Sequence, residues 1–399
     1  MIILRSERHL IKKSNPMWKT IDYYCFQAKN LYNAANYIVR QEFINNRKWI
    51  RYYELDRMMR DNLIYYELGS QASQNTLTLL DKNWKSFFIG IKNWSKKKAF
   101  GYLGKPSLPK YKNKNGRSIL MIKNIQCKII NGEIYFSWKP LNKFRGIKTK
   151  VQGKLMQIRF IPIGACYYME VIYETEGIKN SLENKNIIGI DLGINNFATI
   201  SNNIGLQSII INGRIIKSMN QNYNKLKSKI QKEIESKWCN RLQNITDKHQ
   251  RKIDYFMHCS SKHIIDYCLQ NDIDTIVIGK NDGWKQLSKM GKKNNQNFEY
   301  IPYQKFISKL KYKCENQGIN FIETEESYTS GTSFLDNELP IKENYDRARR
   351  KKRGLFISND GIKINADLNG SYQIIKKVFP NAFEQQDRGC GLHPVRINI

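Results

Sequence analysis

The chain has 399 residues, of which 41% are hydrophobic and 12% aromatic, with 67 Lys and Arg against 35 Asp and Glu. This composition excludes a disordered basic tail, and the length predicts two or more domains, because single cores stop growing below this size. The net charge of +32 is spread along the chain and predicts a polyanionic partner, for which nucleic acid is the default. We expect no membrane partner, since no apolar run is long enough to span a bilayer.

The first half of the chain predicts helices followed by strands. After an extended start, apolar residues recur at helical spacing from Pro16 to about Lys98. Two prolines between Gly104 and Lys112 then end the helical section. Short β-type runs follow at 119–122, 128–130, 134–138, 157–161 and 167–173. They predict a small β-barrel, which the extended N-terminus completes, with the helices inserted between its strands.

The second half has a distinctive order of elements. Three strands are expected first, then two long polar helices, then a strand, a helix, a strand and a final helix, at 187–190, 197–201, 208–212, 222–237, 246–269, 275–278, 303–316, 319–324 and 367–379. This order predicts an RNase H-like fold, in which three antiparallel strands are extended by parallel strands with crossover helices.

Two aspartates occupy the positions that this fold brings together. Asp191 lies in Gly189-Ile190-Asp191-Leu192-Gly193 at the end of the first strand, and Asp367 begins the last helix. Phosphodiester cleavage at such sites uses two Mg²⁺ ions, which bind hard oxygen ligands such as carboxylates. The pair therefore predicts a metal-dependent nuclease.

The third carboxylate that this chemistry needs is not at its usual place. Gly279, at the end of the fourth strand, stands where a Glu is expected. Asp282 follows in a loop, and Glu325 and Glu326 end the neighbouring strand, about 4.8 Å away in a parallel sheet. Because side chains alternate along a strand, only one of the two glutamates should face the site. We favour Glu325 and keep Glu326 as the alternative.

These motifs together resemble those of the TnpB family, the RNA-guided nucleases of insertion sequences from which type V CRISPR effectors are thought to descend. The resemblance covers essentially the whole chain and includes the segments at 29–33, 84–88, 104–112, 189–193, 328–330 and 365–370. It implies an α/β multidomain protein with a wedge-type β-barrel (1–15 and 104–182), an inserted helical recognition lobe (16–103) and a RuvC nuclease domain (183–399). It also implies an element-encoded guide RNA and a double-stranded DNA target with a short flanking motif.

The chain departs from the family in two ways. The usual glutamate is missing at Gly279, and some members are understood to carry a relocated one, for which Glu325 and Glu326 are the candidates. Members often hold a four-cysteine zinc module, but residues 331–364 contain no Cys, so we expect a zinc-less insert. This insert contains a basic run that either forms a solvated loop or binds the DNA backbone: Arg347, Arg349, Arg350, Lys351, Lys352 and Arg353.

The sequence thus predicts an RNA-guided DNA endonuclease of a mobile element, acting as a monomer in the cytoplasm of a prokaryote, at the nucleoid. Its catalytic residues would be Asp191, Glu325, Glu326 and Asp367, with Asp191, Glu325 and Asp367 binding two Mg²⁺ ions, for which Mn²⁺ can substitute. Gly279 keeps a second hypothesis open, an RNA-guided DNA-binding repressor without nuclease activity. A transposase that joins DNA ends itself shares the fold but not the helical lobe.

Overall fold

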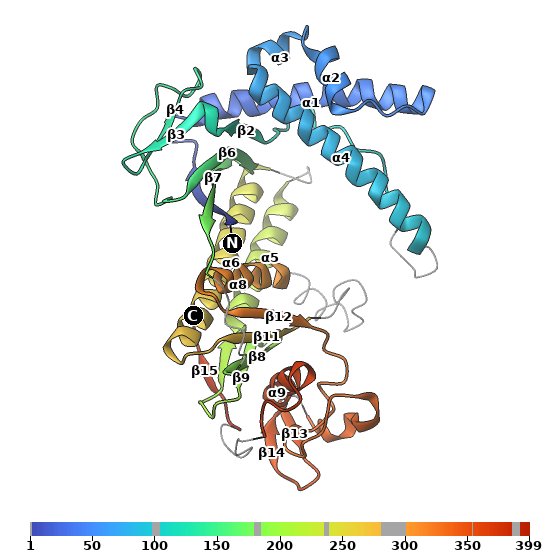
Figure 1. Cartoon of the computed structure of the whole chain (residues 1–399), viewed down its shortest axis with the longest axis vertical. Helices are drawn as coiled ribbons and strands as arrows, with labels where there is room; N and C mark the ends of the chain where they lie inside the picture. The colour runs from blue at the N-terminus through green and yellow to red at the C-terminus, as the bar shows by residue number, and fades with distance from the viewer. Residues whose placement is uncertain are drawn as a thin grey trace. The chain divides into compact units, whose positions relative to one another are not determined.

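The computed structural model describes residues 2–97, 104–178, 185–234, 239–280, 301–352, 354–384 and 392–399. The chain folds into two compact units, Ile2–Glu176 and Gly177–Ile399, and most of their helices and strands are labelled in Figure 1. None of the described helices is long and apolar enough to cross a membrane.

The N-terminal unit combines helices with two antiparallel sheets. Its described helices fill the region predicted to be helical: α1 (Trp18–Asn46), α2 (Tyr52–Met59), α3 (Leu63–Leu68) and α4 (Ser70–Lys97). Its described strands are β1 (Ile2–Ile11), β2 (Leu120–Lys123), β3 (Cys127–Ile130), β4 (Glu133–Phe136), β5 (Ile147–Lys148), β6 (Lys154–Ile163) and β7 (Cys166–Glu176). They pair in the orders β1-β7-β6-β2 and β3-β4-β5. The extended N-terminus joins the strands as predicted, but with two separate sheets a closed barrel is not confirmed.

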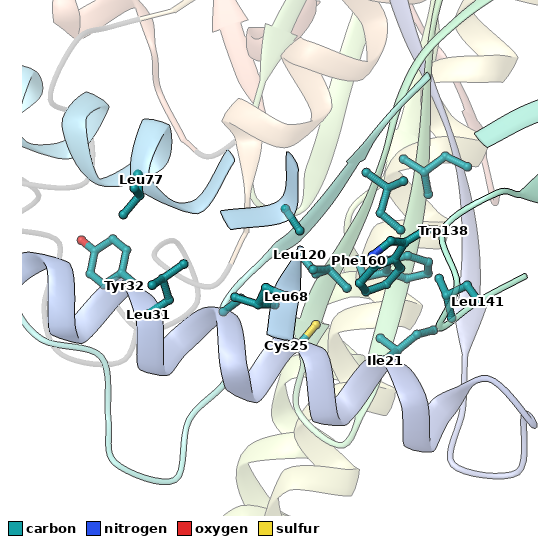
Figure 2. Packing of buried hydrophobic residues seen from close by; sticks show 14 of the residues in the cluster. Ile21, Cys25, Leu31, Tyr32, Leu68, Leu77, Leu120, Trp138, Leu141 and Phe160 are labelled. Carbon is teal, nitrogen blue, oxygen red and sulfur yellow. The ribbon is translucent and has the colours of Figure 1, made fainter. Parts of the chain in front are cut away.

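One apolar core joins the helices of this unit to its sheets (Figure 2). Ile21, Cys25 and Leu31 follow one another at helical spacing along α1 and are fully buried. The same core takes in Leu68 of α3 and Phe160 of β6. The predicted helical lobe and the predicted barrel strands therefore fold around a single core.

The C-terminal unit is built on a six-stranded sheet. Its described strands are β8 (Ile187–Leu192), β9 (Asn196–Asn202), β10 (Ile209–Asn212), β11 (Thr275–Gly279), β12 (Asn320–Thr324) and β15 (Val395–Ile397), in the order β12-β11-β8-β9-β10-β15. β8, β9 and β10 pair antiparallel, while β11 runs parallel to β8 and β12 runs parallel to β11. This confirms the strand order predicted from the sequence. The parallel edge strand β15 was not predicted.

Helices cover both faces of this sheet (Figure 1). α6 (Asn240–Gln270) and α8 (Tyr303–Gln317) pack on the face that carries Ile190 and Ile278, and α5 (Arg214–Glu233) packs beside α6. α9 (Ala366–Val378) covers the opposite face, where its buried residues contact Ile187 and Val277. A short hairpin of β13 (Leu355–Ile357) and β14 (Lys363–Asn365) leads into α9. Because side chains alternate along a strand, Gly189, Asp191 and Gly279 belong to the face covered by α9.

Gly189 lets α9 lie directly on β8. A Cβ atom at this position would be only 2.3 Å from the backbone oxygen of Ser371 and 2.7 Å from Cγ1 of Ile375. Both neighbours belong to α9, so no residue larger than glycine fits without moving the helix. Gly189 is therefore needed for the packing of α9, and Asp191, two residues later, lies on the same face of the sheet.

We predict that Gly189→Ala destabilises the C-terminal unit by about 1–3 kcal/mol, the range for forcing an extra methyl group into a packed core. Urea unfolding followed by circular dichroism measures this loss. Ile190→Val, on the opposite face of the same strand, is the control for a small change in packing volume and should cost about 1 kcal/mol. An unchanged free energy of unfolding for Gly189→Ala would contradict the close contact with α9.

Candidate active site

Asp191 lies at the end of β8 and faces the first turns of α9. The chain turns immediately after it, where the backbone N–H of Gly193 donates to the oxygen of Phe197 at 3.2 Å. On the α9 side, a Cβ atom at Gly370 would lie 3.0 Å from Oδ2 of Asp191. The carboxylate is thus packed against the helix while part of it opens into a pocket.

Asp367 is held in the first turn of α9 by a network of side chains. The helix starts at Asn365, whose Oδ1 accepts from the backbone N–H groups of Asp367 and Leu368 at 3.0 and 3.1 Å. Arg350 donates to Oδ1 of Asp367 at 2.9 Å, and Asn196 donates to Oδ2 at 2.7 Å. Arg396 of β15 in turn donates to Oδ1 of Asn196 at 2.8 Å. Both carboxylate oxygens of Asp367 are therefore oriented.

Glu326 occupies the space that glycine leaves at position 279. A Cβ atom on Gly279 would lie 2.4 Å from Oε1 and 2.6 Å from Cγ of Glu326. Gly279 is in register with Thr324, so Glu326, two residues further on, shares the face of Gly279. The turn that follows is fixed by the Thr329 hydroxyl, which donates to the oxygen of Glu326 at 2.8 Å, and by Tyr328 at a positive φ of 66°.

Glu325 points away from this position. Its side chain is 63% exposed and forms an ion pair with Lys377 at 3.3 Å. Hydrogen bonds from Ser327 and Lys377 keep the pKa of Glu325 below its ordinary value. The structure therefore favours Glu326 over Glu325, which reverses the preference drawn from the sequence. Asp282, the other alternative, lies outside the described residues.

Burial dominates the electrostatics of Asp191 and Glu326. Burial raises the pKa of Asp191 well above its ordinary value, the negative charges of Glu326 and Asp367 raise it further, and Arg350 opposes the shift. Burial also raises the pKa of Glu326 to about 8, with Lys377 acting in the opposite sense. Tyr303 closes this region from the α8 side, where its hydroxyl donates to the oxygen of Gly193 at 2.9 Å. Such a set of carboxylates favours a bound cation.

The three carboxylates line one pocket of about 540 Å³. Arg214, Arg350 and Arg396 line it as well, so that negative and positive side chains share its wall. Three carboxylates are the hard oxygen donors that Mg²⁺ prefers, and the donor set fits this ion. Within the described part of the chain, no three His, Cys, Asp or Glu side chains are already arranged to coordinate a metal ion. The carboxylate of Asp367 accepts hydrogen bonds from Arg350 and Asn196 instead. A metal ion would share or replace the contact of Arg350 with Asp367.

The basic run of the insert divides into buried and exposed members. The structure does not favour the predicted contact of Arg349 with nucleic acid, because its side chain is 11% exposed and donates to both carboxylate oxygens of Glu338 at 2.8 and 2.9 Å. It also donates to the backbone oxygen of Asn344 at 2.7 Å and so ties the insert together. Arg350 reaches Asp367, while Arg347, Lys351 and Lys352 are exposed. Arg353 lies outside the described residues.

Sequence reasoning missed the residues that orient the carboxylates. Asn196 of β9 donates to Asp367, and Arg396 of β15 donates to Asn196, but nothing in their local sequence marks these two residues. Arg214, which begins α5, was likewise not singled out. Thr329 did carry a signal, because the segment Tyr328-Thr329-Ser330 was recognised as a motif, although its hydrogen bond to Glu326 was not foreseen.

We predict that Gly279→Ala destabilises the protein and that Glu326→Ala relieves part of this loss. The added methyl group collides with Glu326 and also approaches Cδ1 of Ile374 at 2.7 Å, so the relief is incomplete. A double-mutant cycle by urea unfolding should give a coupling of about 1 kcal/mol or more. Glu325→Ala is the matched control and should add to Gly279→Ala independently. Strict additivity for Gly279 and Glu326 would contradict their contact.

Two family models match the sequence. Residues 170–285, which include Asp191, match OrfB_IS605, described as a probable transposase. Residues 303–374, which include Glu326 and Asp367, match the TNB domain of Cas12f1-like proteins. A search of the curated proteins finds no match.

Several solved structures are similar to the chain. The mini-RNA-guided endonuclease CRISPR-Cas_phi3 has a TM-score of 0.50 and 10% identity, over 98% of this chain and 94% of that one. A Cas12f1–sgRNA–target DNA complex has a TM-score of 0.39 and 15% identity, over 93% and 98%. CasPhi-2 (Cas12j) bound to crRNA has a TM-score of 0.42 and 9% identity, over 96% and 98%. At 10% identity the first of these shows a shared α/β multidomain fold. The two family models show that the chain is similar to a probable transposase over residues 170–285 and to the TNB domain of Cas12f1-like proteins over residues 303–374.

Proposed function

We propose that the chain is an RNA-guided DNA endonuclease of a mobile element, and that its C-terminal unit is the RuvC-like nuclease domain. The observation that carries this proposal is the meeting of Asp191, Glu326 and Asp367 in one pocket lined by arginines. The matches to a probable transposase and to the TNB domain of Cas12f1-like proteins support it. The similar structures are titled as an RNA-guided endonuclease and as complexes with guide RNA and target DNA, which agrees with the proposed partners.

In the proposed reaction, Asp191, Glu326 and Asp367 hold two Mg²⁺ ions, with Mn²⁺ as a substitute. Mg²⁺ bound there would supply the chemistry that activates a water molecule and stabilises the leaving oxygen of the phosphodiester. The protein's own part is to fix the ligands: Thr329 holds the turn behind Glu326, and Asn196 holds one oxygen of Asp367. Arg214, Arg350 and Arg396 supply positive charge to the phosphate backbone.

We assign the N-terminal unit to the guide RNA and to the short DNA motif beside the target. The helices at 16–103 would form the recognition lobe, and the strands at 1–15 and 104–182 would form the wedge-type domain. Base pairing with the guide would select the target, while the protein would hold the duplex by its backbone, which suits the basic charge. The enzyme would act as a monomer in the cytoplasm, where it reaches the nucleoid, and residues 331–364 would need no zinc.

We predict that Asp191→Asn, Glu326→Gln and Asp367→Asn each reduce cleavage at least about 100-fold, the range for losing one preorganised charge at a reacting centre. The assay combines the protein with RNA transcribed from the 3′ end of its own gene and the flanking sequence. A matching DNA target with a randomised flank and Mg²⁺ then reports cleavage.

Glu325→Gln is the matched control, because Glu325 is exposed and paired with Lys377, and it should retain cleavage within a few-fold. A loss of cutting in Glu325→Gln together with full activity in Glu326→Gln would overturn the assignment of the third carboxylate. Guided binding of DNA without any cleavage by the wild type would leave the repressor as the function.

We predict that Mg²⁺ stabilises the protein more at about pH 8.5 than at about pH 6. Because the pKa of Glu326 is raised from 4.5 to about 8, the folded state loses stability as the pH rises through this window and the carboxyl ionises. Mg²⁺ binds the ionised form and compensates for the charge, so its effect grows with pH. Thermal denaturation with and without Mg²⁺ measures this difference. Glu326→Gln should reduce the pH dependence, and an equal Mg²⁺ shift at both pH values would contradict the raised pKa.

A further inference from the structure

A second cavity lies between α5 and α6, outside the carboxylate pocket. It has a volume of about 670 Å³, within the range of small-ligand pockets, and the two helices that form it pack side by side (Figure 1). Its walls are more apolar than polar, and they include Met219, Leu226 and Ile245. None of its lining residues belongs to the proposed nuclease site.

Aromatic rings stand in and beside this cavity. Tyr223 of α5 stacks on His249 of α6, with ring centroids 4.3 Å apart and planes inclined by 15°. Both rings are fixed at their polar edges, since Tyr223 shares a hydrogen bond with Thr246 at 3.0 Å and Nε2 of His249 donates to Asn220 at 2.8 Å. Tyr255, by contrast, is 72% exposed at the same cavity. One ring is therefore free to receive a flat partner, beside a rigid pair.

The cations of this cavity come from one face of α6. Lys248, Arg251, Lys252 and Tyr255 are spaced three, four and seven residues apart, which places them on the same side of the helix. Among the residues that the structure describes, none forms an ion pair with Lys248, Arg251 or Lys252. The two helices together carry eleven Lys and Arg against four Asp and Glu. The cavity is therefore an apolar slot that has the ring of Tyr255 and the positive charges of Lys248, Arg251 and Lys252 along its opening.

We propose that this cavity binds an unpaired nucleotide of RNA, with the base stacked on Tyr255 and the neighbouring phosphates held by Lys248, Arg251 and Lys252. Single-stranded bases stack on exposed aromatic side chains, whereas the bases of a duplex are not available to a cavity. The proposal rests on the proposed function in one respect, the identity of the strand. A folded guide offers the same unpaired base to every copy of the protein, while the displaced DNA strand changes with each target. A slot edged by the polar side chains of Ser218 and Asn222 suits a constant base.

The test uses the full-length protein and randomised ten-nucleotide RNA, irradiated at 254 nm and mapped by mass spectrometry of the crosslinked peptides. We expect crosslinks at Tyr255 or at residues of the cavity. Tyr255→Ala should weaken RNA binding about 10-fold, the loss of one base stack, while Tyr255→Phe keeps the ring and binds as the wild type. Lys252→Ala should weaken binding more than Lys225→Ala, which removes the same charge from α5 outside the cavity.

Randomised ten-nucleotide DNA distinguishes the source of the strand. Stronger crosslinking of RNA than of DNA at the cavity supports the proposal, and equal or stronger crosslinking of DNA there would overturn it in favour of the displaced strand. Wild-type binding by Tyr255→Ala with crosslinks elsewhere would also overturn it. Asp191→Asn should leave the crosslinks unchanged, so the result does not depend on whether the nuclease proposal holds.

Discussion

The contact between α9 and β8 is the constraint on which the candidate site depends. Asp191 and Asp367 are 176 positions apart in the chain, and they meet because Gly189 allows the helix to lie directly on the strand. The same contact buries Asp191, which raises its pKa and makes a positive partner favourable. The packing of α9 on β8 thus brings the two aspartates together and also makes the binding of a positive charge beside them favourable.

The glycine at 279 and the glutamate at 326 form one complementary unit. The side chain of Glu326 occupies the space that a side chain at position 279 of β11 would need. The residue at one of these positions therefore limits which residue fits at the other. Arg350 and Asn196 orient Asp367 from the other side, and Arg349 anchors the segment that carries Arg350 through Glu338. In a chain whose insert has no cysteine, this arginine–carboxylate contact stabilises the segment that borders the site.

The sequence predicted the sheet order of the C-terminal unit because apolar runs and turn residues mark strands whose pairing follows general topological rules. It favoured Glu325 over Glu326, whereas the structure favours Glu326, because the choice depends on the register between Gly279 and Thr324, which no single strand reveals. The sequence did not distinguish Arg349 from its basic neighbours, because only the structure shows which of these side chains is buried. The barrel was expected from strand count alone, whereas pairing distributes those strands over two sheets.

The most direct test of the central claim is anomalous diffraction from crystals of the protein soaked with Mn²⁺. The account predicts metal peaks about 2.1 Å from the carboxylate oxygens of Asp191, Glu326 and Asp367, the distance of a tightly bound hard cation. It also predicts that Arg350 moves off Asp367 or shares it with the metal. Metal bound to Glu325, or no peak between the three carboxylates in well-ordered crystals, would contradict the account.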